Sequence, residues 1–271
     1  MSTLADVTLS FHSLGEIDLD LRAEVAAAAG FRKIGLSIRR TRSWLEAHPL
    51  AELQTLLDRH GLRVGELEVL APLRGEPDQH DAFAIGLARE LNCPLIQLNG
   101  PFEGTIAEGV QRLRALGDRG ADDGITFSLE FLPWTNIPTA AAGAQIVAAV
   151  DRPNVGICVD AWHLYRSGGE VSDLAELWPL VASVQLDDGP LLSDWPDDLR
   201  EDCVRYRRLP GLGEFDLLAL LSGAERNALG YSLSLEVMSE ELKTKPLGEV
   251  GALLAASTTA ILDTVREAVD V

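Results

Sequence analysis

A carboxylate or amide side chain ends each of four apolar, β-rich runs in this sequence. Glu130 ends ITFSLE, Asp160 ends VGICVD, Glu236 ends YSLSLE, and Gln185 stands at the matching place in VASVQL. Side chains at the ends of parallel strands meet at one edge of a sheet or barrel, where three carboxylates would repel one another unless a divalent cation held them. Oxygen ligands select hard ions, so the expected cofactor is Mg²⁺ or Mn²⁺, with Co²⁺ possible. The pattern predicts a metal site and therefore an enzyme.

Two further residues have the chemistry and the position to act at such a site. His163 follows Asp160 by three residues, and its near-neutral pKa suits proton transfer or a hydrogen bond to a substrate hydroxyl. Arg207 precedes the turn sequence PGLG, which would orient it sharply. An arginine there could hold a hydroxyl, carboxylate or phosphate of the substrate. The alternative for Arg207 is a surface residue paired with nearby acids.

The remaining pocket candidates are less specific. His12 ends the first predicted strand and is expected to face the pocket. Glu66 and Glu68 alternate along the third strand, and of the two we expect only Glu68 to face the interior. Three tryptophans in predicted loops could form an apolar wall around a substrate, the alternative being that they pack between helices: Trp44, Trp134 and Trp162.

The elements that must position these residues alternate along almost the whole chain. Strands are predicted at 7–13, 33–39, 62–70, 94–100, 125–131, 154–160, 181–186 and 231–237. Helices are predicted at 18–30, 49–61, 78–93, 105–124, 139–153, 171–180, 215–230 and at the C-terminus. This alternation over residues 1–271 predicts one domain, a (β/α)₈ barrel, whose active site lies at the C-terminal strand ends. A doubly wound sheet would need a glycine-rich phosphate turn after the first strand, and FHSLGEIDLD has a single glycine.

Composition restricts the partners that the chain can have. The 42 acidic and 23 basic residues give a net charge of −19, which disfavours nucleic acid and anionic membranes. No signal-like segment or membrane-length apolar run is evident. Three cysteines without metal-type spacing favour a reducing, cytoplasmic location.

The motifs SLEF, CVDAWH, VQLDD, RRLPGLGEFD and SLEV, in this order, resemble those of the xylose-isomerase-like (β/α)₈ barrels of sugar isomerases and epimerases. The resemblance covers nearly the whole chain. It implies that Glu130, Asp160, Gln185 and Glu236 hold the metal, that Asp160 and His163 form the family's Asp-x-x-His, and that Arg207 is its conserved arginine. Gln185 stands where histidine is usual, although its amide oxygen can still ligate a hard cation. Some 3-dehydroshikimate dehydratases of the same superfamily are similar, with glutamine at this ligand.

The implied reaction is isomerisation or epimerisation of a sugar or keto-polyol. Proton abstraction α to a carbonyl would give a metal-stabilised enediolate. One of Glu130 and Glu236 would remove the proton and the other return it, while His163 and Arg207 position substrate oxygens. Loss of a β-hydroxyl from a cyclic hydroxy-keto acid, with His163 as the acid, is the alternative outcome. A metal-free, non-catalytic barrel is a second alternative, and relatives of this kind are often homo-oligomers.

Overall fold

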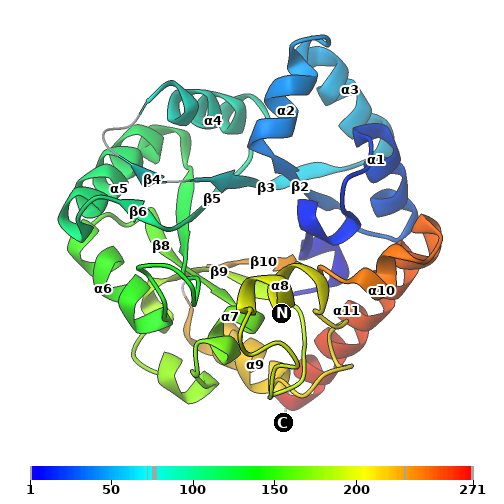
Figure 1. The fold of residues 1–271 in the computed structure, drawn as a ribbon. Coiled ribbons are helices and arrows are strands. Elements are labelled where there is room, and N and C mark those ends of the chain that lie inside the picture. Colours follow the sequence, from blue (N-terminus) through cyan, green and yellow to red (C-terminus); the bar gives the residue numbers. More distant parts are fainter. Residues whose placement is uncertain (1, 72, 75–77, 229, 270–271) are drawn as a thin grey trace.

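Eight parallel strands close into a barrel in the computed structural model, which describes residues 2–71, 73–74, 78–228 and 230–269 (Figure 1). Around the barrel the order is β1-β10-β9-β8-β7-β5-β3-β2, so strands that follow one another in the chain also pair. The barrel strands are β1 (Thr8–Leu9), β2 (Lys33–Ser37), β3 (Arg63–Leu70), β5 (Leu95–Asn99), β7 (Thr126–Glu130), β8 (Val155–Asp160), β9 (Val181–Leu186) and β10 (Ser232–Leu235). The predicted (β/α)₈ barrel is therefore confirmed.

Helices surround the strands on the outside, as Figure 1 shows. They are α1 (Leu19–Ala28), α2 (Ile38–Leu45), α3 (Leu50–His60), α4 (Gln79–Glu90), α5 (Ile106–Gly120), α6 (Ala140–Val150), α7 (Ala161–Arg166), α8 (Leu199–Arg205), α9 (Leu217–Asn227), α10 (Glu240–Lys243) and α11 (Leu247–Val269). Their apolar faces and the outward side chains of the strands form the hydrophobic core. None of the described helices is long and apolar enough to cross a bilayer.

The first two strands are shorter than predicted. β1 ends at Leu9, and a 3₁₀ turn follows over Phe11–Leu14, with the Ser10 hydroxyl accepting a hydrogen bond from the backbone of His12 at 3.2 Å. The second strand was expected to reach residue 39, but it ends at Ser37, whose hydroxyl caps α2. Serine is a favourable N-cap, so this residue stops the strand and begins a helix in a segment expected to be a loop.

The connection after β8 also differs from the prediction. The helix expected at 171–180 is replaced by two 3₁₀ turns at Val171–Leu174 and Trp178–Leu180. Pro179 lacks the backbone N–H that a continuous α-helix would use there. The α-helix lies earlier, because the Asp160 carboxylate accepts from the His163 backbone at 2.8 Å and so caps α7 directly at the strand end.

A short parallel pair, β4 (Leu73–Arg74) and β6 (Phe102–Glu103), extends the structure beyond β3 and β5.

The segment after β9 was expected to be a long polar loop, yet it contains α8 and is held at its end by Asp188. The Asp188 carboxylate accepts hydrogen bonds from the backbones of Gly211 and Gly213, both at 2.9 Å, and of Phe215 at 3.1 Å. This carboxylate therefore fixes the PGLG turn next to the end of β9.

Candidate active site

The barrel brings all four predicted ligands to one end. Glu130 and Asp160 end β7 and β8, Gln185 lies one residue before the end of β9, and Glu236 follows β10. In the pairing register Asp160 lies opposite Gln185, which in turn lies opposite Ser234 of β10. Each of the four side chains is at least 94% buried. Glu130, Gln185 and Glu236 line a cavity of about 730 Å³ at the barrel mouth.

Asp160 is the most enclosed of the four, and both of its oxygens have protein partners. One oxygen accepts from the His163 backbone, and Oδ2 accepts from Arg207 Nη1 at 2.7 Å. Burial alone would raise the pKa of Asp160, but the positive charges of Arg207 and His163 lower it below its ordinary value. Asp160 is therefore ionised in the folded protein at neutral pH.

Arg207 holds several acids of the site together. Its Nη1 contacts the carboxylates of Asp160, of Asp187 and, at 3.1 Å, of Glu236. Its Nε donates to the Cys203 carbonyl at 3.1 Å. The predicted substrate-binding arginine thus lines the cavity, but its side chain is fully buried and its guanidinium is already surrounded by acceptors. In this arrangement it positions acids rather than presenting a free cation.

The segment after β9 explains why Arg207 lies there. The backbones of Arg208 and Asp188 exchange two hydrogen bonds, of 2.7 Å and 3.0 Å, in an antiparallel bridge. The Arg207 backbone N–H donates to the Met238 carbonyl at 3.1 Å, beyond β10. Arg207 is thereby held between the ends of β9 and β10, next to the carboxylates that it contacts.

His163 and Glu130 form a buried pair across α7 and β7. His163 Nε2 lies 3.3 Å from Glu130 Oε1. Burial disfavours the imidazolium, but Asp160, Cys203 and Glu130 raise the pKa of His163 well above its usual value. Burial raises the pKa of Glu130, although the contact with His163 counteracts this. The contact places an imidazole and a carboxylate within reach of one another, which is the arrangement that acid–base chemistry uses.

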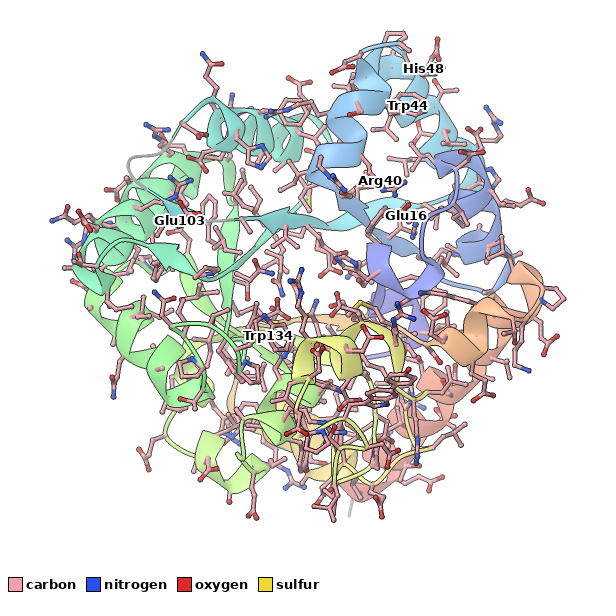
Figure 2. The ribbon with its side chains drawn as sticks, in the orientation of Figure 1. Glu16, Arg40, Trp44, His48, Glu103 and Trp134 are labelled. Carbon is pink, nitrogen blue, oxygen red and sulfur yellow. The ribbon has the colours of Figure 1, made fainter. Side chains whose placement is uncertain are left out.

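The three tryptophans occupy different places. Trp134 follows β7, lines the cavity and packs edge-on against the ring of His163, with centroids 5.4 Å apart. It lies toward the centre of the barrel in Figure 2, whereas Trp44 lies at the outer end of α2 and stacks on His48 at 4.2 Å. Trp162 is fully buried beneath His163, with centroids 5.2 Å apart. Of the three, Trp134 is placed to contact a substrate.

Both Glu66 and Glu68 face the barrel interior, so the expectation that only one of them would do so is wrong. Residues two apart on a strand share a face, and both side chains are 1% exposed. The Ser10 hydroxyl lies 3.0 Å from Glu68 Oε2 and 3.2 Å from Glu236 Oε1, and His12 Nε2 lies 3.7 Å from Glu68 Oε2. Burial raises the pKa of Glu66 well above normal, and the carboxylates of Glu68 and Glu236 add to the increase.

The site contains two groups of side chains that could hold a metal ion. Two groups of residues have ligand atoms within 4.8 Å of one another: Glu130, Asp160 and His163, and His12, Glu68 and Glu236. The predicted ligands are divided between these two groups, with Gln185 at the adjoining position on β9. Among the residues that the structure describes, the Gln185 amide oxygen accepts a hydrogen bond from the Cys158 thiol alone, at 3.3 Å, which leaves it a second lone pair. Burial raises the pKa of Glu130 and of Glu236, and the negative charges of neighbouring carboxylates raise both further. A bound cation would offset the repulsion between these carboxylates.

Several residues of the site were not predicted. Asp187 follows Gln185 by two residues and so shares its inward face, and it is fully buried against Arg207. Gln97 and Asn99 line the cavity from β5, and the alternation in PLIQLNG was the available signal. Cys203 lines it from α8, which no apolar periodicity had indicated.

The fold and this cluster of strand-end acids define a barrel of the type that carries its chemistry at the C-terminal rim. Residues 23–257 match the family model described as xylose isomerase-like TIM barrel. The chain belongs to this family, and the predicted resemblance is confirmed.

Curated relatives are enzymes of more than one class. The chain is 30% identical over 136 residues to a 3-dehydroshikimate dehydratase of Pseudomonas aeruginosa, a match that covers 49% of this chain and 21% of that protein. It is 27% identical over 201 residues to a 2-oxo-tetronate isomerase of Haemophilus influenzae, covering 64% of this chain and 73% of that one. The chain thus spans about a fifth of the dehydratase and nearly three quarters of the isomerase.

Among solved structures, the IOLI protein with a binding zinc atom superposes with a TM-score of 0.79 over 96% of this chain and 99% of that one. The two sequences are 20% identical, so this likeness shows a common fold.

Proposed function

We propose that this chain is a divalent-metal-dependent isomerase or epimerase that removes a proton α to the carbonyl of a small, polyhydroxylated substrate. The observation that carries the proposal is the pair of buried glutamates, Glu130 and Glu236, on separate strands around one cavity. Burial raises the pKa of both, which is the shift that a carboxylate base needs to take up a proton near neutral pH. The isomerase relative supports this class of reaction.

The four predicted ligands would hold the cation: Glu130, Asp160, Gln185 and Glu236. When bound, a divalent cation polarises a substrate carbonyl and makes the adjacent C–H more acidic. Glu130 and Glu236 would transfer the proton from two strands that are not adjacent in the barrel. His163, at 3.3 Å from Glu130, would donate a hydrogen bond or proton to a substrate oxygen.

Other residues would orient the substrate and exclude water. His12 and Glu68 line the cavity from the β1 and β3 side, and Trp134 covers the β7 side. Arg207 would keep Asp160 and Glu236 in place, while Trp162 would hold the ring of His163. An apolar wall opposite polar groups is what a sugar ring with one apolar face requires.

Dehydration is the second candidate, and Gln185 favours it. The chain carries an amide where the sugar isomerases that it resembles carry histidine, and the dehydratase relative is 30% identical over the matched region. The same proton abstraction would start the reaction. His163 would then protonate a departing β-hydroxyl, so that water is lost instead of a proton returned.

One experiment separates these outcomes. The protein, loaded with Mn²⁺, is incubated in D₂O with D-psicose, with 2-oxo-tetronate and with 3-dehydroshikimate. Deuterium at an α-carbon without a new chromophore supports isomerisation or epimerisation. An ultraviolet-absorbing aromatic product from 3-dehydroshikimate supports dehydration. Exchange that does not exceed the Glu236→Gln background with any compound would refute both and favour a non-catalytic barrel.

A further inference from the structure

A second pocket lies beside the active site and is lined by arginines. Residues 25–45 contain Arg32, Lys33, Arg39, Arg40 and Arg42 but no acidic residue, in a chain of net charge −19. This stretch runs from α1 through β2 into α2, so it reaches the rim of the barrel at the end of β2. Arg42 stacks over Phe83, with its guanidinium carbon 4.3 Å from the ring centroid, and the other two arginines of α2 face the pocket.

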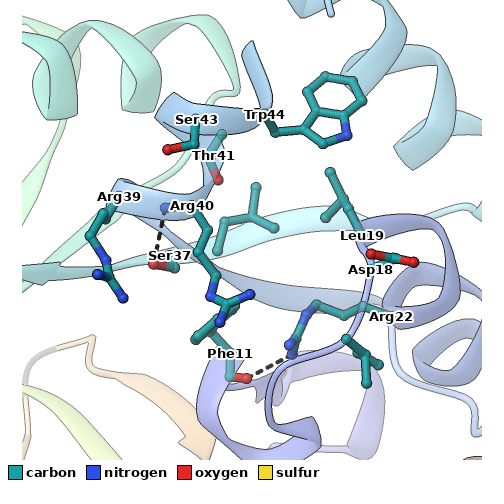
Figure 3. Close-up of a pocket in the computed structure, with 12 residues that line it drawn as sticks. Phe11, Asp18, Leu19, Arg22, Ser37, Arg39, Arg40, Thr41, Ser43 and Trp44 are labelled. Carbon is teal, nitrogen blue, oxygen red and sulfur yellow. Dashed lines mark hydrogen bonds between the residues drawn. The ribbon is translucent and has the colours of Figure 1, made fainter. Parts of the chain in front are cut away.

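Figure 3 shows how the pocket is built. Its volume is about 510 Å³. Arg22 and Arg40 lie over the ring of Phe11, with their guanidinium carbons 4.4 Å and 5.5 Å from its centroid. Arg39 approaches from one side, and Trp44 lies above, on the opposite side from Phe11. Arginines on an aromatic floor are a suitable environment for an anion that is attached to an apolar or sugar-like frame.

A third hollow shares lining residues with both the arginine pocket and the active-site cavity. This hollow has a volume of about 380 Å³, and its lining includes Ser37, Arg39, Arg40, Glu16, His12 and Glu68. His12 and Glu68 also line the active-site cavity, whereas the two arginines also line the arginine pocket. The hollow therefore places Arg39 and Arg40 beside His12 and Glu68, which also line the active-site cavity.

The arginines are only partly neutralised. Arg22 is buried and donates to the backbone carbonyls of Phe11 and Gly15, at 2.7 Å and 2.6 Å, and among the described residues it forms no ion pair. Arg40 pairs with Glu16, which is 78% exposed and free to swing into water. Within the described part of the chain, Arg39 makes no hydrogen bond or ion pair. The remaining acid of the pocket, Asp18, lies at the opposite end from Arg39 in Figure 3.

We propose that this rim is an anion subsite and that the substrate is a polyhydroxylated ketone bearing a carboxylate or phosphate, which Arg39 and Arg40 bind. The inference rests on the proposed function for the reacting end of the substrate. A molecule of charge −19 repels anions, so an acidic substrate requires local positive charge next to the reaction site. Arg40 would exchange Glu16 for the substrate anion, and Arg39 would supply the fork geometry that suits two oxygens.

The test compares Arg39→Gln with Arg59→Gln, a matched charge change on α3 that lines neither the cavity nor the arginine pocket. Inorganic phosphate is first titrated into both metal-free variants and the wild-type protein while the unfolding temperature is followed. Phosphate should stabilise the wild type and Arg59→Gln but not Arg39→Gln. Equal stabilisation of all three proteins, or of none, would overturn the subsite.

Kinetics with Mn²⁺-loaded protein then identify the anion. We expect Arg39→Gln to raise KM about tenfold or more for 3-dehydroshikimate or for fructose 6-phosphate, whichever is accepted, with kcat nearly unchanged. KM for the neutral ketose D-psicose should not change. Equal effects on neutral and anionic compounds would contradict the inference while leaving the proposed reaction intact. If phosphate raises the unfolding temperature only when Arg39 is present, but no compound is turned over, the anion site is supported and the proposed reaction is refuted.

Discussion

At the scale of single residues, the site is defined by buried carboxylates that differ in their partners. Arg207 and His163 hold the pKa of Asp160 below its ordinary value, so that Asp160 stays ionised. Burial raises the pKa of Glu130 and of Glu236 despite their contacts with His163 and Arg207, so these two glutamates can take up a proton. This division between a fixed charge and two proton carriers is what a base-catalysed transfer across a substrate requires.

Replacing a proton carrier by its amide should abolish turnover while keeping the shape of the site. We expect Glu130→Gln and Glu236→Gln each to lower kcat by about 10³-fold or more, because the amide cannot accept the proton. Deuterium incorporation from D₂O measures the loss. Glu24→Gln, on the exposed face of α1, is the matched control and should retain full activity. Activity within tenfold of wild type in both site variants would exclude them as the bases.

Glu66 gives a prediction about pH. Burial and the neighbouring carboxylates raise its pKa in the folded protein, so the folded state binds more protons than the unfolded chain. Stability should then fall as pH rises from the unfolded value, about 4.3, through the raised folded value. In the metal-free protein, Glu66→Gln should raise the unfolding temperature at about pH 8 by at least about 2 °C and flatten its pH dependence. If the unfolding temperature of Glu66→Gln changed with pH as steeply as that of the wild type, this prediction would be wrong.

At the scale of the elements, Gly35 of β2 leaves room for the side chain of Glu68 from the neighbouring strand β3. A Cβ at Gly35 would overlap with Oε1 of Glu68 and lie 3.0 Å from the backbone nitrogen of Phe11. The Phe11 N–H donates to that same Glu68 oxygen at 2.8 Å. The glycine therefore leaves the space in which Glu68 is held next to Ser10 and His12.

Gly35→Ala should displace Glu68 and destabilise the fold by about 1–3 kcal/mol, as overpacked sites do. Gly86→Ala, in α4, is the control, since a Cβ there meets nothing within 4 Å and should raise stability by up to about 1 kcal/mol. Chemical denaturation measures both changes. If Gly35→Ala were as stable as wild type with unchanged metal affinity, the proposed packing of Glu68 would be wrong.

The elements also show what the sequence could and could not predict. Strand ends such as Glu130 and Asp160 were predictable, because apolar runs closed by an acid are informative on their own. The role of Ser37 as the last residue of β2 and the N-cap of α2 was not predictable, because it depends on where α2 packs. The role of Arg207 was hidden for a similar reason: the three carboxylates around it come from β8, β9 and the end of β10, and only the closed barrel brings them together. Glu66 could have been predicted from its two-residue spacing to Glu68.

At the scale of the whole molecule, the residues that stabilise the barrel and the residues of the candidate active site lie in different layers. The hydrophobic core lies between the strands and the helices, while the strand ends carry acids that repel one another. Arg207, His163 and the proposed cation offset that repulsion, and the arginine rim beyond β2 extends positive charge to the surface of a strongly acidic chain.

Calorimetric titration of Mn²⁺ into the metal-free protein tests most directly whether the strand-end carboxylates form one cation site. We expect one ion bound per chain, and an affinity that falls by about a hundredfold or more in Glu130→Gln and in Glu236→Gln. Glu24→Gln should bind as the wild type does. No saturable binding, or binding that neither site variant weakens, would show that these carboxylates do not form a cation site.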